Sequence, residues 1–530
     1  MSTNPSPYDV VIAGAGHNGL IAACYLAQAG LRVLMLEKND YIGGATYSKQ
    51  VFPGVDARLS VYSYLVSLLP EKILSDLGLR FETRRRAVAS YTPLEQAGQH
   101  KGLLISNVSE AVTRQSFLDF TGGGASGERE YQGWLALDEK LNLFARKVWP
   151  TLLAPLPSKE DLRARFETPA EREIWDYLVE KPLNCLIEDH LADDTVRGAV
   201  FTDAKIGVPT YPEDPSLLQN RTFLYHVIGQ GTGEWRVPVG GMGALVDALV
   251  NRARGLGVEM RTGAEVLRVE PGKPRHAVVY RVEGAEQAVE ARFVLFNTAS
   301  NIANRILPGV YEEQQVEGSV FKINMVLKKL PTMKDPRVSA QDAFNGTFHI
   351  YEGYEQMRES YQNARAGIRL GRLPGEMYCH SLTDPSILSP GLQQQGYQTL
   401  TLFGLDVPYS WFLQNNAATR EEILQTYLRE ISAFIEEDIT DLLAVDAHGS
   451  PCVEARSPLD LEELLGLPKG NIFHGNLSWP FAERAEQAGT WGVETAYKNI
   501  YICGSSALRG GAVSGIPGHN AAMKVLGGGE

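Results

Sequence analysis

Residues 8–37 read YDVVIAGAGHNGLIAACYLAQAGLRVLMLE. The β-branched run at 10–13 predicts a strand, and the apolar stretch at 20–29 predicts a helix that ends at Gly30. Residues 33–36 predict a second strand, which leads directly into Glu37. A strand, a glycine-rich turn, a helix and a second strand that ends in an acid are typical of a dinucleotide-binding β-α-β unit.

Each glycine of this turn has its own physical task. Gly14 allows the tight turn, Gly16 lets backbone N–H groups approach a pyrophosphate without a Cβ in the way, and Gly19 lets the helix pack closely on the sheet. The helix N-terminus, at Asn18, adds partial positive charge and free donors. Glu37 is expected to accept hydrogen bonds from ribose hydroxyls, and its charge would oppose a 2′-phosphate, which disfavours NADP.

A second glycine pair helps to decide between NAD and FAD. Gly43 and Gly44, followed by Ala45, come just after the ribose-binding acid and the neighbouring Lys38. A second close approach of backbone to cofactor is needed by the extended FAD more than by NAD. The pair therefore favours FAD, with an ordinary loop turn as the alternative.

Two later glycine clusters predict a return of the chain to the same site. Residues 238–243 precede a predicted helix at 244–253, which is followed by predicted strands near 265–269, 277–282 and 293–297. The glycines at 229–233 follow a predicted strand at 222–228 but lead into no helix, so they predict no second dinucleotide-binding turn. The last cluster, 504–520, follows a predicted strand at 500–503. The residues expected to contact FAD are Gly14, Gly16, Asn18, Gly19, Glu37, Lys38, Gly43, Gly44, Ala45, Gly241, Met242, Val266, Gly504, Ser505, Gly515, Ile516 and Asn520.

The composition excludes several classes of protein. The chain has 530 residues, 44% hydrophobic and 21% charged, with a net charge of −13, which speaks against disorder and against binding of nucleic acid. No apolar run reaches about 18 residues and the N-terminus resembles no export signal, so we expect a cytoplasmic protein. The five cysteines form no C-x-x-C and no metal-ligand spacing, so neither a disulfide framework nor a metal site is predicted.

Beyond these physical arguments, the motifs resemble a known family. Residues 14–37, 238–242 and 503–522 are similar to the phytoene desaturase-like FAD-dependent oxidoreductases, and most closely to the branch called pyridine nucleotide-disulfide oxidoreductase domain-containing protein 2. The resemblance implies an α/β fold with a glutathione-reductase-type, Rossmann-like FAD-binding domain and an interleaved substrate domain of mixed sheet and helices. The FAD-binding domain would comprise residues 1–75, 236–300 and 460–530, and the substrate domain residues 76–235 and 301–459.

The resemblance also implies a reaction. We expect a desaturase, dehydrogenase or oxidase that transfers a hydride between a largely apolar small molecule and flavin N5, with dioxygen or a quinone as the final acceptor. His226, His519 and Arg509 are the candidate catalytic residues, each with a structural role as the alternative. Arg509 stands where the branch usually has a different sequence, which raises the alternative of an amine or other small polar substrate. A non-enzymatic carrier of prenyl-like groups, peripheral contact with a membrane and a homo-oligomer remain open.

Overall fold

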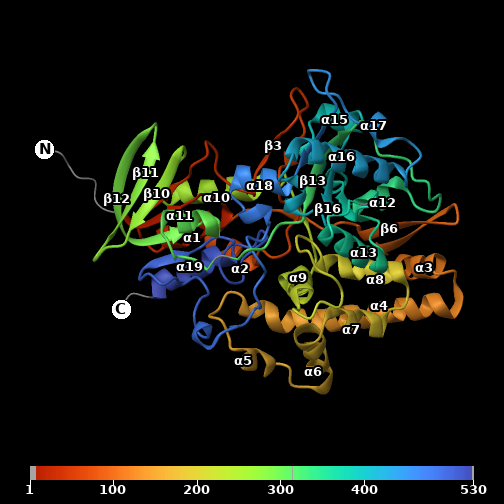
Figure 1. Ribbon diagram of the computed structural model, residues 1–530, viewed down its shortest axis with the longest axis horizontal. Helices are drawn as coiled ribbons and strands as arrows, with labels where there is room; N and C mark the ends of the chain where they lie inside the picture. Colours follow the sequence, from red (N-terminus) through yellow and green to blue (C-terminus); the bar gives the residue numbers. More distant parts are fainter. Residues whose placement is uncertain (1–7, 313, 370, 528–530) are drawn as a thin grey trace.

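The computed structural model describes residues 8–312, 314–369 and 371–527. Two seven-stranded sheets lie side by side, and a layer of helices from α3 to α9 lies beneath the second one in the view of Figure 1. Among the residues described, no helix has the length and apolar character needed to cross a lipid bilayer.

The first sheet is the one predicted from the glycine-rich unit. Its order is β10-β11-β12-β1-β2-β9, and β18 pairs with β12. Strands β1, β2, β9, β12 and β18 pair in parallel, whereas β10, β11 and β12 form an antiparallel meander. The strands are β1 (Tyr8–Ala13), β2 (Val33–Leu36), β9 (Glu259–Arg261), β10 (Ala264–Glu270), β11 (His276–Val282), β12 (Ala285–Phe296) and β18 (Ile500–Ile502).

Both faces of this sheet are covered, which explains why its central strands are apolar throughout. Val10 and Ile12 pack on one face with helices from three distant parts of the chain, whereas Val11 and Ala13 pack on the other face with the meander and α11. The covering helices are α1 (His17–Gln28), α10 (Gly243–Gly255), α19 (Ile516–Gly527) and α11 (Ser300–Ile306). The dinucleotide-binding core is therefore assembled from the start, middle and end of the chain.

The second sheet forms the centre of the other half. Its order is β17-β13-β16-β15-β14-β6-β7, antiparallel except for the parallel pair β14 and β6. The strands are β6 (Val88–Gln96), β7 (Gln99–Ser106), β13 (Phe321–Leu327), β14 (Thr347–Ile350), β15 (Gly375–Tyr378), β16 (Gln398–Gly404) and β17 (Val453–Arg456). Helix α16 (Asn416–Ser432) packs its apolar side on this sheet. All seven strands fall within the ranges expected for the substrate domain, whose exact boundaries stay a prediction.

The helical layer forms a separate apolar core around Trp175. It consists of α3 (Glu110–Phe120), α4 (Gly124–Val148), α5 (Lys159–Arg163), α6 (Pro169–Trp175), α7 (Leu183–His190), α8 (Asp194–Phe201) and α9 (Leu218–Val227). The strand predicted at 222–228 is wrong, because these residues belong to helix α9. That helix is buried on several sides, so its sequence lacks the one-sided apolar period by which a surface helix is recognised.

The remaining elements connect these layers. A two-stranded hairpin, β3 (Ser48–Gln50) with β4 (Arg58–Ser60), follows the second glycine pair, and β5 (Thr83–Arg84) pairs with β8 (Val237–Pro238). The other helices are α2 (Glu71–Leu77), α12 (Ala340–Asn345), α13 (Tyr354–Arg365), α14 (His380–Thr383), α15 (Pro390–Gln394), α17 (Ile439–Leu442) and α18 (Pro458–Leu465).

Candidate functional site

The glycine-rich turn lies between the end of β1 and the start of α1, and it packs against Asn297 at the end of β12. Gly14 has a φ of 93°, and a Cβ there would lie 2.9 Å from the carbonyl oxygen of Asn297. A Cβ on Gly19 would lie 2.6 Å from Asn297 Nδ2. The Asn297 amide in turn donates to the carbonyls of Gly14 and Gly16, at 3.2 and 3.3 Å. Asn297 was missed by the sequence analysis, although its place at the end of a predicted strand could have indicated it.

The second glycine pair lies directly against this turn. The Gly43 N–H donates to the Ala15 carbonyl at 3.0 Å, and a Cβ on Gly44 would lie 3.4 Å from the Gly16 Cα. Glu37 is 7% exposed, and its carboxylate accepts from the N–H groups of Ala15 at 2.8 Å and Asn39 at 2.9 Å. The predicted ribose-binding acid therefore also holds the turn in shape. This packing of backbone without side chains is what a pyrophosphate group requires, so the residues fit a dinucleotide.

A cavity of about 550 Å³, which we call the turn cavity, opens beside the first glycine. Gly14, Lys38 and Val266, all predicted to contact the cofactor, line it. Thr298 also lines it, and its hydroxyl is buried without a hydrogen-bond partner among the described residues. The rest of the lining includes Ala13, Leu36, Asn301, Ile302, Arg305, Glu462 and Glu463. Its position beyond β1 and β2 is where the adenosine half of a dinucleotide binds in this type of sheet.

The middle glycine cluster contacts the site through the β3–β4 hairpin. Met242 is fully buried in the core of the first sheet, and its N–H donates to Ser60 Oγ at 3.1 Å. Gly241 has a φ of 78° and lines a small cavity that also contacts Tyr64. Met242 therefore has a packing role, and Gly241 is buried beside the small cavity.

The C-terminal cluster approaches the turn from the other side. Asn18 Nδ2 donates to Ser505 Oγ at 3.4 Å, and a Cβ on Gly504 would lie 3.1 Å from the Cα of Asn297. Helix α19 packs along α1, with Gly515 and Gly518 allowing the close approach; a Cβ on Gly518 would lie 2.1 Å from the Asn18 carbonyl. Ile516 is buried in the apolar core of the helical layer, and the Asn520 amide donates to the Leu152 carbonyl at 3.2 Å. Ile516 and Asn520 therefore hold α19 in place, and neither lines the turn cavity.

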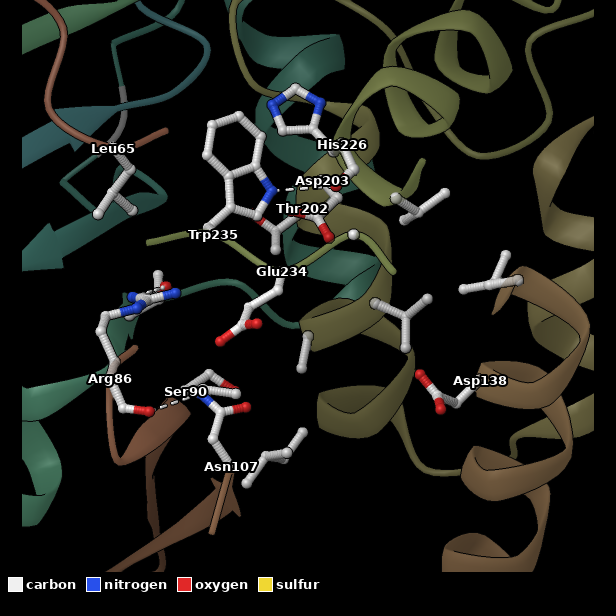
Figure 2. Close-up of a pocket in the computed structure, with 18 of the residues that line it drawn as sticks. Leu65, Arg86, Ser90, Asn107, Asp138, Thr202, Asp203, His226, Glu234 and Trp235 are labelled. Atoms are coloured by element: carbon white, nitrogen blue, oxygen red, sulfur yellow. Dashed lines mark hydrogen bonds between the residues drawn. The ribbon is translucent and has the colours of Figure 1, made fainter. Parts of the chain in front are cut away.

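A larger cavity of about 640 Å³, the main cavity, lies between the second sheet and the helical layer. Figure 2 shows Arg86 and Asp138 on opposite sides of it, with Glu234 between them. The apolar wall consists of side chains of α4, α8 and α9, namely Trp134, Leu137, Leu141, Val200, Phe223 and Val227, although Asp138 and Asn142 of α4 also line the cavity there. The ionisable wall consists of groups from both layers: Arg86, His349 and Glu376 from the second sheet and the segment before it, and Asp203 and His226 from the helical layer. The largely apolar substrate expected from the sequence would match the apolar wall alone.

The ionisable wall is held by few hydrogen bonds. Arg86 donates to Thr347 Oγ1 at 3.0 Å, and its Nε is buried without a partner. Glu376 accepts from Thr202 Oγ1 at 2.9 Å and from the Tyr378 hydroxyl. Loss of contact with water raises the pKa of the Asp203 carboxyl and that of Glu376 to about 7. A polar group of a substrate would therefore meet one guanidinium and two carboxyls that are each about half ionised at pH 7.

Of the predicted catalytic residues, His226 lines the main cavity. Its ring stacks on Trp235 with centroids 5.4 Å apart, and Nδ1 lies 2.8 Å from the Thr222 carbonyl. Because a carbonyl can only accept, Nδ1 carries the proton and Nε2 is the free acceptor of the neutral ring. Burial lowers the pKa of His226, so the neutral form is favoured.

His519 and Arg509, the other two candidates, lie outside both cavities. The His519 ring packs against Tyr25 at 5.3 Å, behind α1, and its Nδ1 lies 2.9 Å from Asn520 Oδ1. The Arg509 guanidinium is buried and donates to three backbone carbonyls at 2.8 to 3.1 Å, those of Thr151, Ala154 and Trp491. These contacts join α19 and the last cluster to the helical layer. Both residues therefore have the contacts expected of the structural alternative, and their catalytic role stays a prediction.

The sequence analysis also missed most of the ionisable wall. Arg86, Asp203, Glu376 and Trp235 were given no role in the sequence-based prediction. They come from separate elements with no shared motif, so no local signal marks them.

Comparisons with known proteins agree with this architecture. Residues 12–69 match the NAD(P)-binding Rossmann-like domain. The chain is 43% identical to an uncharacterized protein of Mycobacterium tuberculosis, across 99% of this chain and 98% of the relative. It is 28% identical to the mouse (Mus musculus) pyridine nucleotide-disulfide oxidoreductase domain-containing protein 2, across 98% and 93%. It is 24% identical to a carotenoid 3,4-desaturase of Haloarcula japonica over about half of each chain.

Solved structures share the fold at low sequence identity. An oxidoreductase from Methanosarcina mazei superposes with a TM-score of 0.56 at 13% identity, covering 98% of this chain and 100% of the other. Cyclohexylamine oxidase from Brevibacterium oxydans superposes with a TM-score of 0.53 at 14% identity, covering 98% and 99%. These similarities establish that the two-part architecture, with its discontinuous dinucleotide-binding sheet, is one that oxidoreductases use.

Proposed function

Because the chain belongs to the phytoene desaturase-like FAD-dependent oxidoreductases, we propose that it binds one FAD and oxidises an amphipathic small molecule in the main cavity. The named relatives are an oxidoreductase domain-containing protein and a desaturase, which favours an enzyme over a non-enzymatic carrier. The observation that carries the substrate proposal is the main cavity, with one apolar wall and one ionisable wall.

The residues that would hold FAD follow from the geometry of the turn. Gly14, Gly16 and Gly19, with the second pair, provide backbone free of side chains for the pyrophosphate. The turn cavity, with Lys38, Val266 and the unpaired Thr298 hydroxyl, supplies room and polar contacts for the adenosine half. When bound, FAD would accept a hydride from the substrate. Dioxygen or a quinone is the proposed final acceptor.

The two walls define the substrate class. Side chains of α4, α8 and α9 would bury a hydrocarbon part, and Arg86 with the carboxyls of Asp203 and Glu376 would hydrogen-bond a polar head. This combines the two alternatives from the sequence, the apolar substrate and the small polar one, in a single molecule. His226 lines this cavity, its neutral ring has Nε2 as the acceptor, and this nitrogen can take a proton from the polar head as it is oxidised.

The test is the flavin spectrum of the purified protein. We expect a yellow protein from which heat releases FAD, and anaerobic bleaching by compounds with an apolar chain and an amino, hydroxyl or carboxyl head. A colourless protein that takes up no added FAD would contradict the cofactor assignment. Bleaching by a hydrocarbon polyene but by no compound with a polar head would contradict the substrate class.

A cavity-filling variant tests where the substrate binds. Ala199 lines the apolar wall, so Ala199→Phe should occupy part of the main cavity, whereas Ala199→Ser should not. We expect Ala199→Phe to slow bleaching about tenfold or more, a loss of at least about 1.4 kcal/mol of transition-state binding. FAD content should stay at the wild-type level in both variants. Unchanged bleaching by Ala199→Phe would place the substrate elsewhere.

A further inference from the structure

Three side chains of types that bind metal ions, one histidine and two glutamates, form a compact group at the ionisable wall. His349 on β14 and Glu376 on β15 are directly opposite each other in the sheet, and Glu352 follows two residues after β14. One ring nitrogen and one oxygen of each carboxylate lie within 4.8 Å of one another. All three residues are at most 3% exposed. The sequence predicted no metal site, because these residues come from two strands and have no motif spacing.

Glu352 is the residue that requires an explanation. Both of its carboxylate oxygens are buried and have no hydrogen-bond partner in the described chain. Oε2 points toward the group and lies 3.8 Å from His349 Nδ1. A buried charge without a partner costs several kcal/mol, so such carboxylates are paired, bound to a metal ion or protonated.

The charge balance of the surroundings favours a divalent cation. Four carboxylates lie in this region, those of Asp203, Glu352, Glu376 and Asp406, and the bases among them are Arg86 and Lys205. Lys205 is already paired with Asp406 at 2.8 Å. When all six groups are ionised, two negative charges remain, and one divalent cation would neutralise them.

Hydrogen bonds from neighbouring threonines hold two of the three candidate metal ligands in place. Thr92 Oγ1 lies 2.8 Å from His349 Nδ1, and Thr202 Oγ1 donates to Glu376 at 2.9 Å. Such outer partners fix the orientation of metal ligands. One imidazole with two carboxylates suits a divalent transition metal such as Zn²⁺ or Mn²⁺.

We propose that His349, Glu352 and Glu376 bind a divalent transition-metal cation at the inner wall of the main cavity. His349 and Glu376 line the cavity, so a coordination position not taken by protein would face it, as in sites where a metal binds substrate or water. Two ligand atoms about 2.1 Å from one tetrahedral zinc ion lie about 3.4 Å apart. The ligand atoms, now within 4.8 Å of one another, must therefore move closer together around the ion, and the unbonded Glu352 carboxylate is free to do so.

The test is a direct measurement of bound metal. The full-length protein is stripped with a chelator and then titrated separately with Zn²⁺ and Mn²⁺, with metal content measured by mass spectrometry and affinity by calorimetry. We expect one ion per chain and a higher thermal midpoint of the loaded protein. Glu352→Gln keeps the shape but removes the charge, and it should abolish stoichiometric binding. Thr92→Val removes only an outer partner and should weaken binding about 10- to 100-fold.

Asp138→Asn is the matched control, because Asp138 lines the same cavity but lies on α4, outside the group. It should bind metal as the wild type does. The proposal would be overturned if the protein binds fewer than half an ion per chain at saturating Zn²⁺ and Mn²⁺, or if Glu352→Gln binds the metal with wild-type affinity. The buried carboxyls would then be protonated and not bound to a metal ion. If Glu352→Gln does not fold, the Thr92→Val result decides, since unchanged affinity in that variant also overturns it. FAD content measured in the same samples reports on the proposed function independently.

Discussion

The dinucleotide-binding turn and the substrate half of the molecule bury polar groups in different ways. At the turn, the Glu37 carboxylate and the Asn297 amide are each paired with two backbone groups. In the substrate half, Glu352, Glu430 and Arg86 each keep at least one buried polar atom without a partner. The two side chains that hold the backbone of the turn are thus fully paired, although His17, Asn18 and Thr298 beside it keep one buried atom each without a partner among the described residues. In the substrate half even a whole carboxylate, that of Glu352, has no partner among them.

This difference follows from what each region must bind. A pyrophosphate is held by backbone N–H groups, so the turn needs a fixed main-chain shape and few side chains. The main cavity is lined by side chains from several elements, and such side chains can change without altering the fold. The comparison is sharpened by three variants, in order of decreasing expected effect.

The largest effect is expected at Glu430, on α16 behind the second sheet. Its Oε1 accepts from the Leu373 N–H at 2.7 Å, its Oε2 has no partner, and burial raises its pKa to about 8. Since the unfolded value is about 4.3, the folded protein favours the protonated form, and stability is lost as the pH rises from about 4.3 through about 8. The loss should be about 5 kcal/mol. Glu430→Gln is neutral at every pH, so it should be more stable than the wild type at pH 9.

The measurement is urea unfolding of both proteins at pH 5, 7 and 9. The difference between them should grow with pH, in favour of the variant. If the free energy of unfolding of the two proteins changes with pH in parallel, Glu430 is charged in the folded protein. It would then no longer be an example of an unpaired buried group in the substrate half.

The second variant concerns the turn itself. A Cβ on Gly16 has one close neighbour in the protein, Asn297 Nδ2 at 3.2 Å, so Gly16→Val should fold. Its side chain would occupy the space that the pyrophosphate needs, and FAD binding should weaken about a hundredfold, or about 2.7 kcal/mol. Gly255→Ala is the control, because a Cβ there meets nothing within 4 Å. Fluorescence titration of the stripped proteins with FAD measures both, and wild-type affinity of Gly16→Val would contradict the assigned site.

The first region was predictable from the sequence because its signals are local. The predicted strands at 10–13 and 33–36 correspond to β1 and β2, and the predicted helix at 20–29 lies within or next to α1, which begins three residues earlier. Glycines report backbone shape directly, so the turn and the second pair could be placed without knowledge of the fold. Asn297 was missed because its role depends on the contact between β12 and the turn.

The main cavity could not be predicted in the same way. Arg86, Asp203 and Glu376 are far apart in the sequence and meet only after the second sheet and the helical layer have formed. His519 and Arg509 lie in a motif-rich segment, yet the close packing of α19 on α1 turns them into the protein interior. Helix α9 was predicted as a strand because its aromatic and β-branched residues are buried on more than one side.

The smallest effect separates the two histidines that the sequence treated alike. His226 lines the main cavity with Nε2 free, whereas His519 packs between Tyr25 and Trp491. If His226 takes the proton, His226→Gln should slow anaerobic bleaching by a substrate with an ionisable head about tenfold to a hundredfold, at the low end of general-base effects or below it. His519→Gln should bleach at a rate close to that of the wild type and lower only the thermal midpoint. Equal loss of rate in both variants, at full FAD content, would mean that the packing around α19 controls the reaction and that the cavity wall is not its chemical centre.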